Sequence, residues 1–175
     1  MKATAVPFLG AVGCCRLHEA VSTKEVWLLE IDRIMDMLDW HNPEEVRQLG
    51  REMADKVRCI NVFILPFYKE YHTKSVWDNC AIILAGKSDE ELRPYLVRLL
   101  EWLKDLNWPG AYCILERLNR FERTDYFNRA VTKTICYASR LPEKFWMMNL
   151  FRIKGVKFRF RVTRNESKSL KNGKL

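Results

Sequence analysis

One cysteine in the sequence has a setting that could support nucleophilic chemistry. Cys80 lies in the pentapeptide Trp77–Ala81, close to the expected beginning of a helix, where the helix dipole lowers the pKa of a thiol. A working thiolate also needs a base, and the one candidate nearby is His72, eight residues upstream. The alternative is a packed Cys80, with Asp78 and Asn79 capping or bracing the turn. We favour the packed cysteine and predict no catalytic residue.

The other titratable residues form no recognisable reactive or metal-binding group. Glu44–Glu45 and Glu90–Glu91 are adjacent pairs, and neighbours on a helix point in different directions, so they suit helix N-termini better than an acid–base dyad. His18, His41 and His72 are too scattered to suggest a metal site, and no glycine-rich phosphate loop is present. The sequence therefore predicts no metal and no cofactor.

The C-terminal part of the chain alternates apolar and basic residues. In residues 156–162, VKFRFRV, a strand would place the apolar side chains on one face and the basic ones on the other. Such a face could bind RNA, an acidic protein or an anionic surface. The alternative, which we favour, is a short added strand or a disordered, solvated end. The candidate anion-binding residues are Lys157, Arg159, Arg161 and Arg164.

The distribution of charge separates this tail from the rest of the chain. Of 30 basic and 22 acidic residues, nine basic and one acidic residue lie in residues 151–175, which leaves 21 of each in residues 1–150. The body is formally neutral, and the whole net charge of +8 resides in the tail. The composition therefore does not predict a basic surface on the folded body.

Cysteine usage and hydropathy indicate the compartment. The six cysteines form no CxxC pair and no zinc-finger spacing, which is typical of reduced core cysteines in a cytosolic protein. The apolar run ATAVPFLGAVGCC near the N-terminus resembles a short signal segment, but it is too short and interrupted to span a membrane. We expect a cytoplasmic protein without a transmembrane segment. Residues 1–22 are predicted to be a flexible extension, either a leader or an over-extended start.

Several aromatic and polar residues are candidates for binding a partner protein. Trp40, Trp102 and Trp108 fall at expected corners between helices, where they could form an exposed patch or act as wedges between neighbouring helices. We favour the wedge interpretation. The partner-binding candidates are Trp40, Trp77, Asp78, Asn79, Trp102, Asn107 and Trp108.

Helices must position these residues, because helix-start signals recur along the chain at a fixed interval. The first helical residues of four expected helices are spaced 33 residues apart: Pro43, Val76, Pro109 and Pro142. Asn42 and Ser75 are the expected caps of the first two helices, and Glu45 completes a capping box. An apolar residue lies six positions into each helix: Leu49, Ile82, Leu115 and Met148.

A further set of helices precedes these four. We expect them at approximately Thr23–Trp40, Arg58–Tyr71, Ser88–Asp105 and Thr124–Ser139. Pro66 breaks the second of them, and Pro94 must kink the third or mark its true start. The pattern predicts an all-α fold of about four stacked helical hairpins, a HEAT-like array. An irregular helical bundle is the alternative.

Two segments resemble a known family. The residues WDNCA at Trp77–Ala81 and LLEWLKDLNWPGA at Leu99–Ala111 are similar to the signature of an uncharacterised bacterial family, a domain of unknown function numbered five-zero-seven-one. The resemblance extends over roughly Met35 to Asn149. It implies an all-helical, HEAT-like fold, and it brings no activity, cofactor or catalytic residue.

These features predict a helical-repeat domain over residues 23–150, followed by a basic extension over residues 151–175. The expected function is that of a non-enzymatic protein-interaction module whose partner is another protein. By analogy with small helical proteins, this includes a toxin-neutralising, immunity-type role. The alternative function is binding of nucleic acid or an anionic surface through the basic tail.

Overall fold

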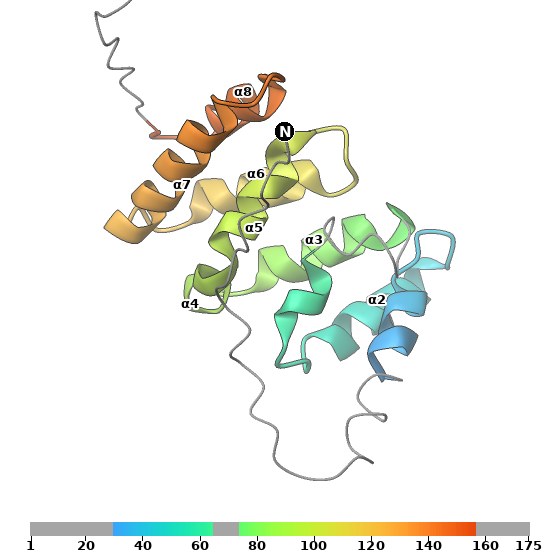
Figure 1. The fold of residues 1–175 in the computed structure, drawn as a ribbon. Coiled ribbons are helices and arrows are strands. Elements are labelled where there is room, and N and C mark those ends of the chain that lie inside the picture. The colour runs from blue at the N-terminus through green and yellow to red at the C-terminus, as the bar shows by residue number, and fades with distance from the viewer. Residues whose placement is uncertain (1–29, 65–73, 157–175) are drawn as a thin grey trace, which may run out of the picture.

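The computed structural model describes residues 30–64 and 74–156, and these residues fold into helices without strands (Figure 1). Residues 30–37 are helical. The α-helices that follow are α2 (Glu44–Ala54), α3 (Trp77–Gly86), α4 (Asp89–Leu92), α5 (Leu96–Glu101), α6 (Ala111–Arg120), α7 (Asp125–Ala138) and α8 (Phe145–Leu150). The 3-10 turns are η1 (Ile60–Phe63), η2 (Lys74–Val76), η3 (Arg93–Tyr95) and η4 (Trp102–Lys104). The all-α prediction is confirmed.

The helices follow the order of the predicted hairpins, except that the short turn η1 lies where the first helix of the second pair was expected. We call α2, α3, α6 and α8 the second helices. Among them, α3 packs against both α2 and α6, while of the first helices α5 packs against α7. The last pair closes the described body, because α8 contacts both α7 and η4. Whether this packing continues into a HEAT-like array stays a prediction.

The predicted interval between helix starts is confirmed to within one residue, although the residues predicted to cap the first two helices are wrong. The second helices begin 33, 34 and 34 residues apart. Asn42 does not cap α2; its side-chain amide donates to the carbonyl of Asp36 (2.6 Å) at the end of the preceding helix, and Pro43 is the N-cap. Ser75 lies in η2, and its hydroxyl donates to Asp39. Asn42 bonds a residue six positions away and Ser75 bonds one 36 positions away, and these bonds compete with capping.

The two later starts are also displaced. Pro109 precedes α6 by two residues, because Gly110 takes a left-handed conformation (φ 77°) as its N-cap. Pro142 precedes α8 by three residues, and Lys144 is the N-cap there. The ammonium of Lys144 accounts for this delay, since it donates to the carbonyls of Ser139 and Leu141 beyond α7.

The first helices differ more from the prediction. The helix expected over Arg58–Tyr71 is wrong in its described part, where the chain forms only the short turn η1. The helix expected over Ser88–Asp105 is divided into α4, η3, α5 and η4, with the first break at Pro94, as the missing amide hydrogen requires. The helix expected over Thr124–Ser139 is confirmed as α7, with Thr124 accepting from the amide of Phe127.

Burial differs among the positions of the predicted repeat. Of the apolar residues six positions into each expected helix, Leu115 is buried, whereas Leu49, Ile82 and Met148 are exposed. The packed body also extends beyond residue 150, because Ile153 is only 1% exposed. The extension predicted over residues 1–22, and the basic segment from residue 157 onward, lie outside the described residues.

None of the helices in residues 30–64 and 74–156 is both long enough and apolar enough to cross a membrane.

Candidate functional site

The two segments that carry the family resemblance meet at one packed corner. The indole of Trp77 lies edge-on to those of Trp102 and Trp108, with ring centroids 5.9 and 5.6 Å away. Gly110 makes this approach possible, since a Cβ atom there would lie 2.4 Å from the Cβ of Ala81. The corner therefore sets the spacing of α3 and α6, which is an architectural role.

Asn79 joins three helices from within the core. Its side chain is 1% exposed, and its amide donates to the carbonyl of Leu38 (2.7 Å) at the end of the first described helix. Its side-chain oxygen accepts from the guanidinium of Arg51 (2.5 Å) on α2. Asn79 is thus a buried brace, and a partner on the surface cannot reach it.

Cys80 is not a candidate nucleophile in this structure. The side chain is fully buried, and its sulfur lies 4.0 Å from that of Met35. Burial raises the pKa of the thiol far above its ordinary value, so the thiolate is not populated near neutral pH. The base suggested for it, His72, lies outside the described residues.

A serine, a histidine and an aspartate do come together at another corner, but in an unreactive order. Asp39 stands between the other two: one carboxylate oxygen contacts Nδ1 of His41 (2.6 Å), and the other accepts the hydroxyl of Ser75. The pKa of Asp39 is lowered, first by the Ser75 hydroxyl and then by the His41 amide. Nε2 of His41 accepts from the indole of Trp40 (3.2 Å), so no imidazole nitrogen faces the serine.

Asp89 and Arg117 form a comparable brace between α4 and α6. The buried guanidinium of Arg117 contacts Asp89 (2.5 Å) and donates to the carbonyl of Lys87 (2.9 Å). The second carboxylate oxygen accepts from the amide of Glu122 (2.7 Å). Burial raises the pKa of Asp89, but the Glu122 amide and Arg117 outweigh it, so that the pKa is lowered. The side chains of Asp89 and Arg117 are thus occupied in holding α4 and α6 together.

The adjacent acidic pairs also serve the helix ends. Glu91 accepts from the amide of Ser88 (2.8 Å), and the Ser88 side chain accepts from the amide of Glu91, which completes a capping box. Glu44 pairs with Arg47 and Arg51 on its own helix. Both arrangements agree with the predicted role at helix N-termini.

The predicted partner-binding residues divide into interior and surface groups. Trp77, Asn79 and Trp102 are buried, which agrees with the wedge interpretation of Trp102, and Trp108 is half-buried against the core. The predicted residues that remain exposed are Trp40, Asp78 and Asn107. The four predicted anion-binding residues, Lys157, Arg159, Arg161 and Arg164, lie outside the described residues.

A different set of surface residues emerges from the structure. Each second helix exposes at least one large apolar side chain; we call the following four the second-helix face: Leu49, Ile82, Tyr112 and Met148. Leu49 and Ile82 are each the sixth residue of α2 and α3, which are in contact. The sequence signal for three of these residues was their regular spacing, which indicated architecture and gave no hint of exposure.

Carboxylates accompany the apolar residues of this face. Asp78 on α3 and Glu116 on α6 are both exposed, and both act on the half-buried thiol of Cys113. The pKa of Cys113 is raised, first by burial and then by the negative charge of Glu116, with Asp78 adding to it and Arg120 opposing. Both carboxylates therefore lie within electrostatic reach of Cys113, on the two helices α3 and α6 that are in contact.

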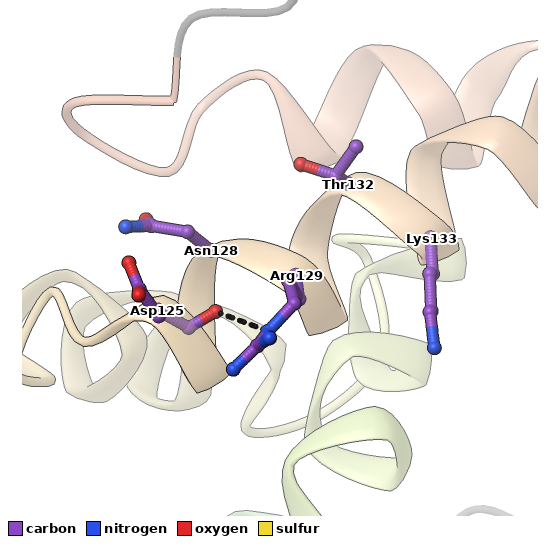
Figure 2. A pocket seen from close by; sticks show the side chains of 5 residues that line it. All are labelled: Asp125, Asn128, Arg129, Thr132 and Lys133. Carbon is purple, nitrogen blue, oxygen red and sulfur yellow. Dashed lines mark hydrogen bonds between the residues drawn. The ribbon is translucent and has the colours of Figure 1, made fainter.

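A shallow pocket lies elsewhere, on the outer side of α7. Figure 2 shows the five residues that line it, which share one face of the helix: Asp125, Asn128, Arg129, Thr132 and Lys133. The guanidinium Nε of Arg129 donates to the backbone carbonyl of Asp125 (3.2 Å), drawn as a dashed line. These side chains are exposed and of mixed charge, and none was a predicted site residue. In residues 30–64 and 74–156, no three or more His, Cys, Asp or Glu side chains gather closely enough to hold a metal ion.

Comparison with known proteins identifies a family but no activity. The sequence model of a family described as a domain of unknown function (DUF5071) matches residues 73–163, just over half of the chain. The match begins later and extends further than the resemblance in the sequence suggested. No curated protein and no solved structure matches the chain.

Proposed function

Because the chain belongs to the family described as a domain of unknown function (DUF5071), and membership brings no activity with it, we propose a function from its surface. The proposal is that the protein is a non-enzymatic interaction module that binds another protein through the second-helix face. Helical-repeat proteins use the same strategy, since each stacked helix contributes one or two side chains to an extended binding surface.

The observation that carries this proposal is the repeated exposure of large apolar side chains. Leu49 and Ile82 are 50% and 49% exposed, and Tyr112 and Met148 are 56% and 60% exposed. Single exposed apolar residues are common on protein surfaces and need no explanation. Each of the four second helices carries at least one such residue, and α8 also exposes Phe145, so that the exposure recurs along the set, as is typical of interaction surfaces.

The charge of the face indicates the chemistry of the partner. Asp78 lies one helical turn from Ile82 on α3, Glu116 lies one turn from Tyr112 on α6, and the exposed Glu45 and Glu52 lie on α2. A complementary protein surface would present apolar side chains surrounded by basic residues. An anionic ligand such as RNA would be repelled there, so nucleic-acid binding through the basic tail stays a separate prediction.

The experiment that tests the proposal is affinity capture with paired surface variants. The tagged full-length chain is compared with Ile82→Glu and with Val97→Glu, using lysate of the organism that encodes it. Val97 is a matched control because it is 50% exposed and lies on α5, among the first helices. Both substitutions place a carboxylate at an equally exposed helical position.

We expect the wild-type chain and Val97→Glu to retain one stoichiometric partner. The amount of partner captured by Ile82→Glu should be at least about tenfold lower, as for truncation of a binding hot spot. Unchanged urea unfolding midpoints would show that both variants fold. Equal retention by the two variants, or no partner with the wild type, would contradict the proposal. The immunity-type role stays a prediction by analogy, and the captured partner would then be a toxin.

A further inference from the structure

We infer that one edge of α7 is a binding site for single-stranded nucleic acid. The site consists of exposed cationic side chains beside two exposed tyrosines, along α7 and in the turn that follows it. We call the following five residues the α7 edge: Tyr126, Arg129, Lys133, Tyr137 and Arg140. The inference goes beyond the proposed function, because the site lies on a first helix and takes a different class of ligand.

The first support is that the helix gathers these side chains on one side. Successive residues of an α-helix lie about 100° apart, which places Tyr126, Arg129, Lys133 and Tyr137 within an arc of about 80°. Figure 2 shows the side chains of Arg129 and Lys133 extending to the same side of α7. Arg140 follows in the turn after the helix, where it is exposed and its amide donates to the carbonyl of Tyr137 (3.1 Å). The cations and the aromatic rings therefore follow one another along the same edge.

The second support is that nearby carboxylates do not cancel this charge. The helices α5 and α7 are in contact, and each contains one acidic residue. The carboxylate of Asp125 on α7 points away from the two cations drawn in Figure 2. Glu101 on α5 is largely buried, and it contacts Arg98 (3.9 Å) and Lys104 (3.3 Å). The positive charge of the α7 edge is therefore available to a ligand.

Further cations lie at both ends of the edge. Near the beginning of α7, the backbone carbonyl of the exposed Arg93 accepts the hydroxyl of Tyr126 (3.2 Å). Beyond the end of α7, where the helix dipole is negative, the ammonium of Lys144 donates to the carbonyls of Ser139 and Leu141 (2.6 Å each). Positive charge thus extends over the whole length of the edge, which favours a ligand with a chain of phosphates over a single small anion.

The third support is the tyrosines, which distinguish a nucleic acid from an acidic protein. Tyr126 and Tyr137 are 45% and 58% exposed, and they lie about 16–17 Å apart along the helix axis. The hydroxyl of Tyr126 is fixed by its bond to η3, and the ring of Tyr137 lies edge-on to that of Trp146, with centroids 6.0 Å apart. Aromatic rings held beside a cationic track are surfaces on which unpaired bases stack.

The number of phosphate contacts sets the expected salt dependence. Each contact with a single strand contributes about −0.7 to the slope of the logarithm of the binding constant against the logarithm of salt concentration. Contacts from Arg129, Lys133 and Arg140 would together give a slope of about −2. An increase in salt from about 50 to 200 mM would then weaken binding about 20-fold.

The test is fluorescence anisotropy of the full-length chain with a labelled oligouridylate of about 12 nucleotides, titrated over this range of salt. The variant Arg129→Gln/Lys133→Gln removes two of the proposed phosphate contacts. The matched control is Arg33→Gln/Lys56→Gln, which removes the same two types of cation at exposed positions in the first described helix and after α2. Urea unfolding midpoints show that the variants fold.

We expect Arg129→Gln/Lys133→Gln to weaken binding at least about tenfold at 50 mM salt and to reduce the magnitude of the slope by about 1.4. The control should stay within about twofold of the wild type in affinity.

A third variant, Tyr137→Leu, tests the stacking surface, because leucine keeps an apolar contact with Trp146. It should weaken binding at least about fivefold and leave the slope unchanged, since a stacked ring releases no counterion.

Three outcomes would overturn the inference. One is an equal effect of the two charge variants, or no binding by the wild type. Another is a loss of binding in Arg159→Gln/Arg161→Gln alone, which would assign the ligand to the basic tail. The third is competition by polyglutamate as effective as that by unlabelled oligouridylate, which would assign the α7 edge to an acidic protein.

Discussion

Replacing Gly110 by alanine tests the close corner between α3 and α6. Gly110 has φ 77°, a left-handed conformation that is unfavourable for alanine by about 1–2 kcal/mol. The added Cβ would also lie 2.4 Å from the Cβ of Ala81 and 3.0 Å from the carbonyl oxygen of Trp77. Neither is the end of a flexible side chain, so the helices must separate, and such overpacking costs about 1–3 kcal/mol. The variant should therefore lose about 2–5 kcal/mol of unfolding free energy.

Two other glycines distinguish the cost of the left-handed backbone conformation from the cost of the steric overlap. Gly155 has φ 80°, but the nearest atom to its Cβ position is Nε of Arg123, 4.0 Å away. Gly155→Ala should lose only the conformational part, about 1–2 kcal/mol. Gly86, the last residue of α3, has open space around it, so Gly86→Ala should be neutral or stabilising by up to about 1 kcal/mol.

The assay is urea unfolding of the full-length chain and the three variants, followed by far-ultraviolet circular dichroism. The expected order of stability is Gly86→Ala, then Gly155→Ala, then Gly110→Ala. Equal losses for Gly110→Ala and Gly155→Ala, within about 0.5 kcal/mol, would refute the claim that the two family segments are held in close contact.

Three further predictions follow from the braces and the carboxylates of the described body. Asn79→Ala should lose about 2–3 kcal/mol in urea unfolding, because it removes the buried donor to the carbonyl of Leu38 and one acceptor of the Arg51 guanidinium, whereas the exposed Asp78→Ala should change stability by less than about 0.5 kcal/mol. Since folding lowers the pKa of Asp89, its charge stabilises the fold above the ordinary carboxyl pKa of about 3.9 and ceases to do so as the pH falls through the lowered value. Asp89→Asn should therefore flatten the loss of stability in that acid range, and an unchanged slope in pH-dependent unfolding would contradict this. Because burial and two carboxylates raise the pKa of Cys113, Glu116→Gln should lower the midpoint of its pH–rate profile with iodoacetamide, and an unmoved midpoint would exclude the electrostatic contribution.

Helix type and interval could be predicted from the sequence because they depend on local signals. Thr124 both caps α7 and precedes a regular apolar pattern, so this helix was predicted to within a residue at each end. Asn42 and Ser75 were wrongly predicted as caps because their side chains bond elsewhere: Asn42 to the carbonyl of Asp36 in the preceding helical turn, and Ser75 to Asp39, 36 residues away. The segment after Arg58 contains a continuous apolar run without helical period, and it forms the turn η1.

The candidate surface could be predicted only in part, since exposure depends on neighbouring helices. Leu49 and Leu115 occupied the same position in the predicted repeat, yet the first is exposed and the second is buried. The predicted wedge role of Trp102 agrees with its complete burial. Asp78 is the one predicted partner-binding residue on a helix of the second-helix face beside an exposed apolar residue of that face, and the role of Glu116 becomes apparent only when α3 and α6 are placed together.

The most direct test of the central claim is the affinity of the purified partner for Ile82→Glu and Val97→Glu, measured by calorimetry with full-length chains. Ile82→Glu should raise the dissociation constant at least about tenfold, while Val97→Glu should leave it within about twofold of the wild type. Equal dissociation constants for the two variants, or a larger effect of Val97→Glu, would contradict the assignment of binding to the second-helix face.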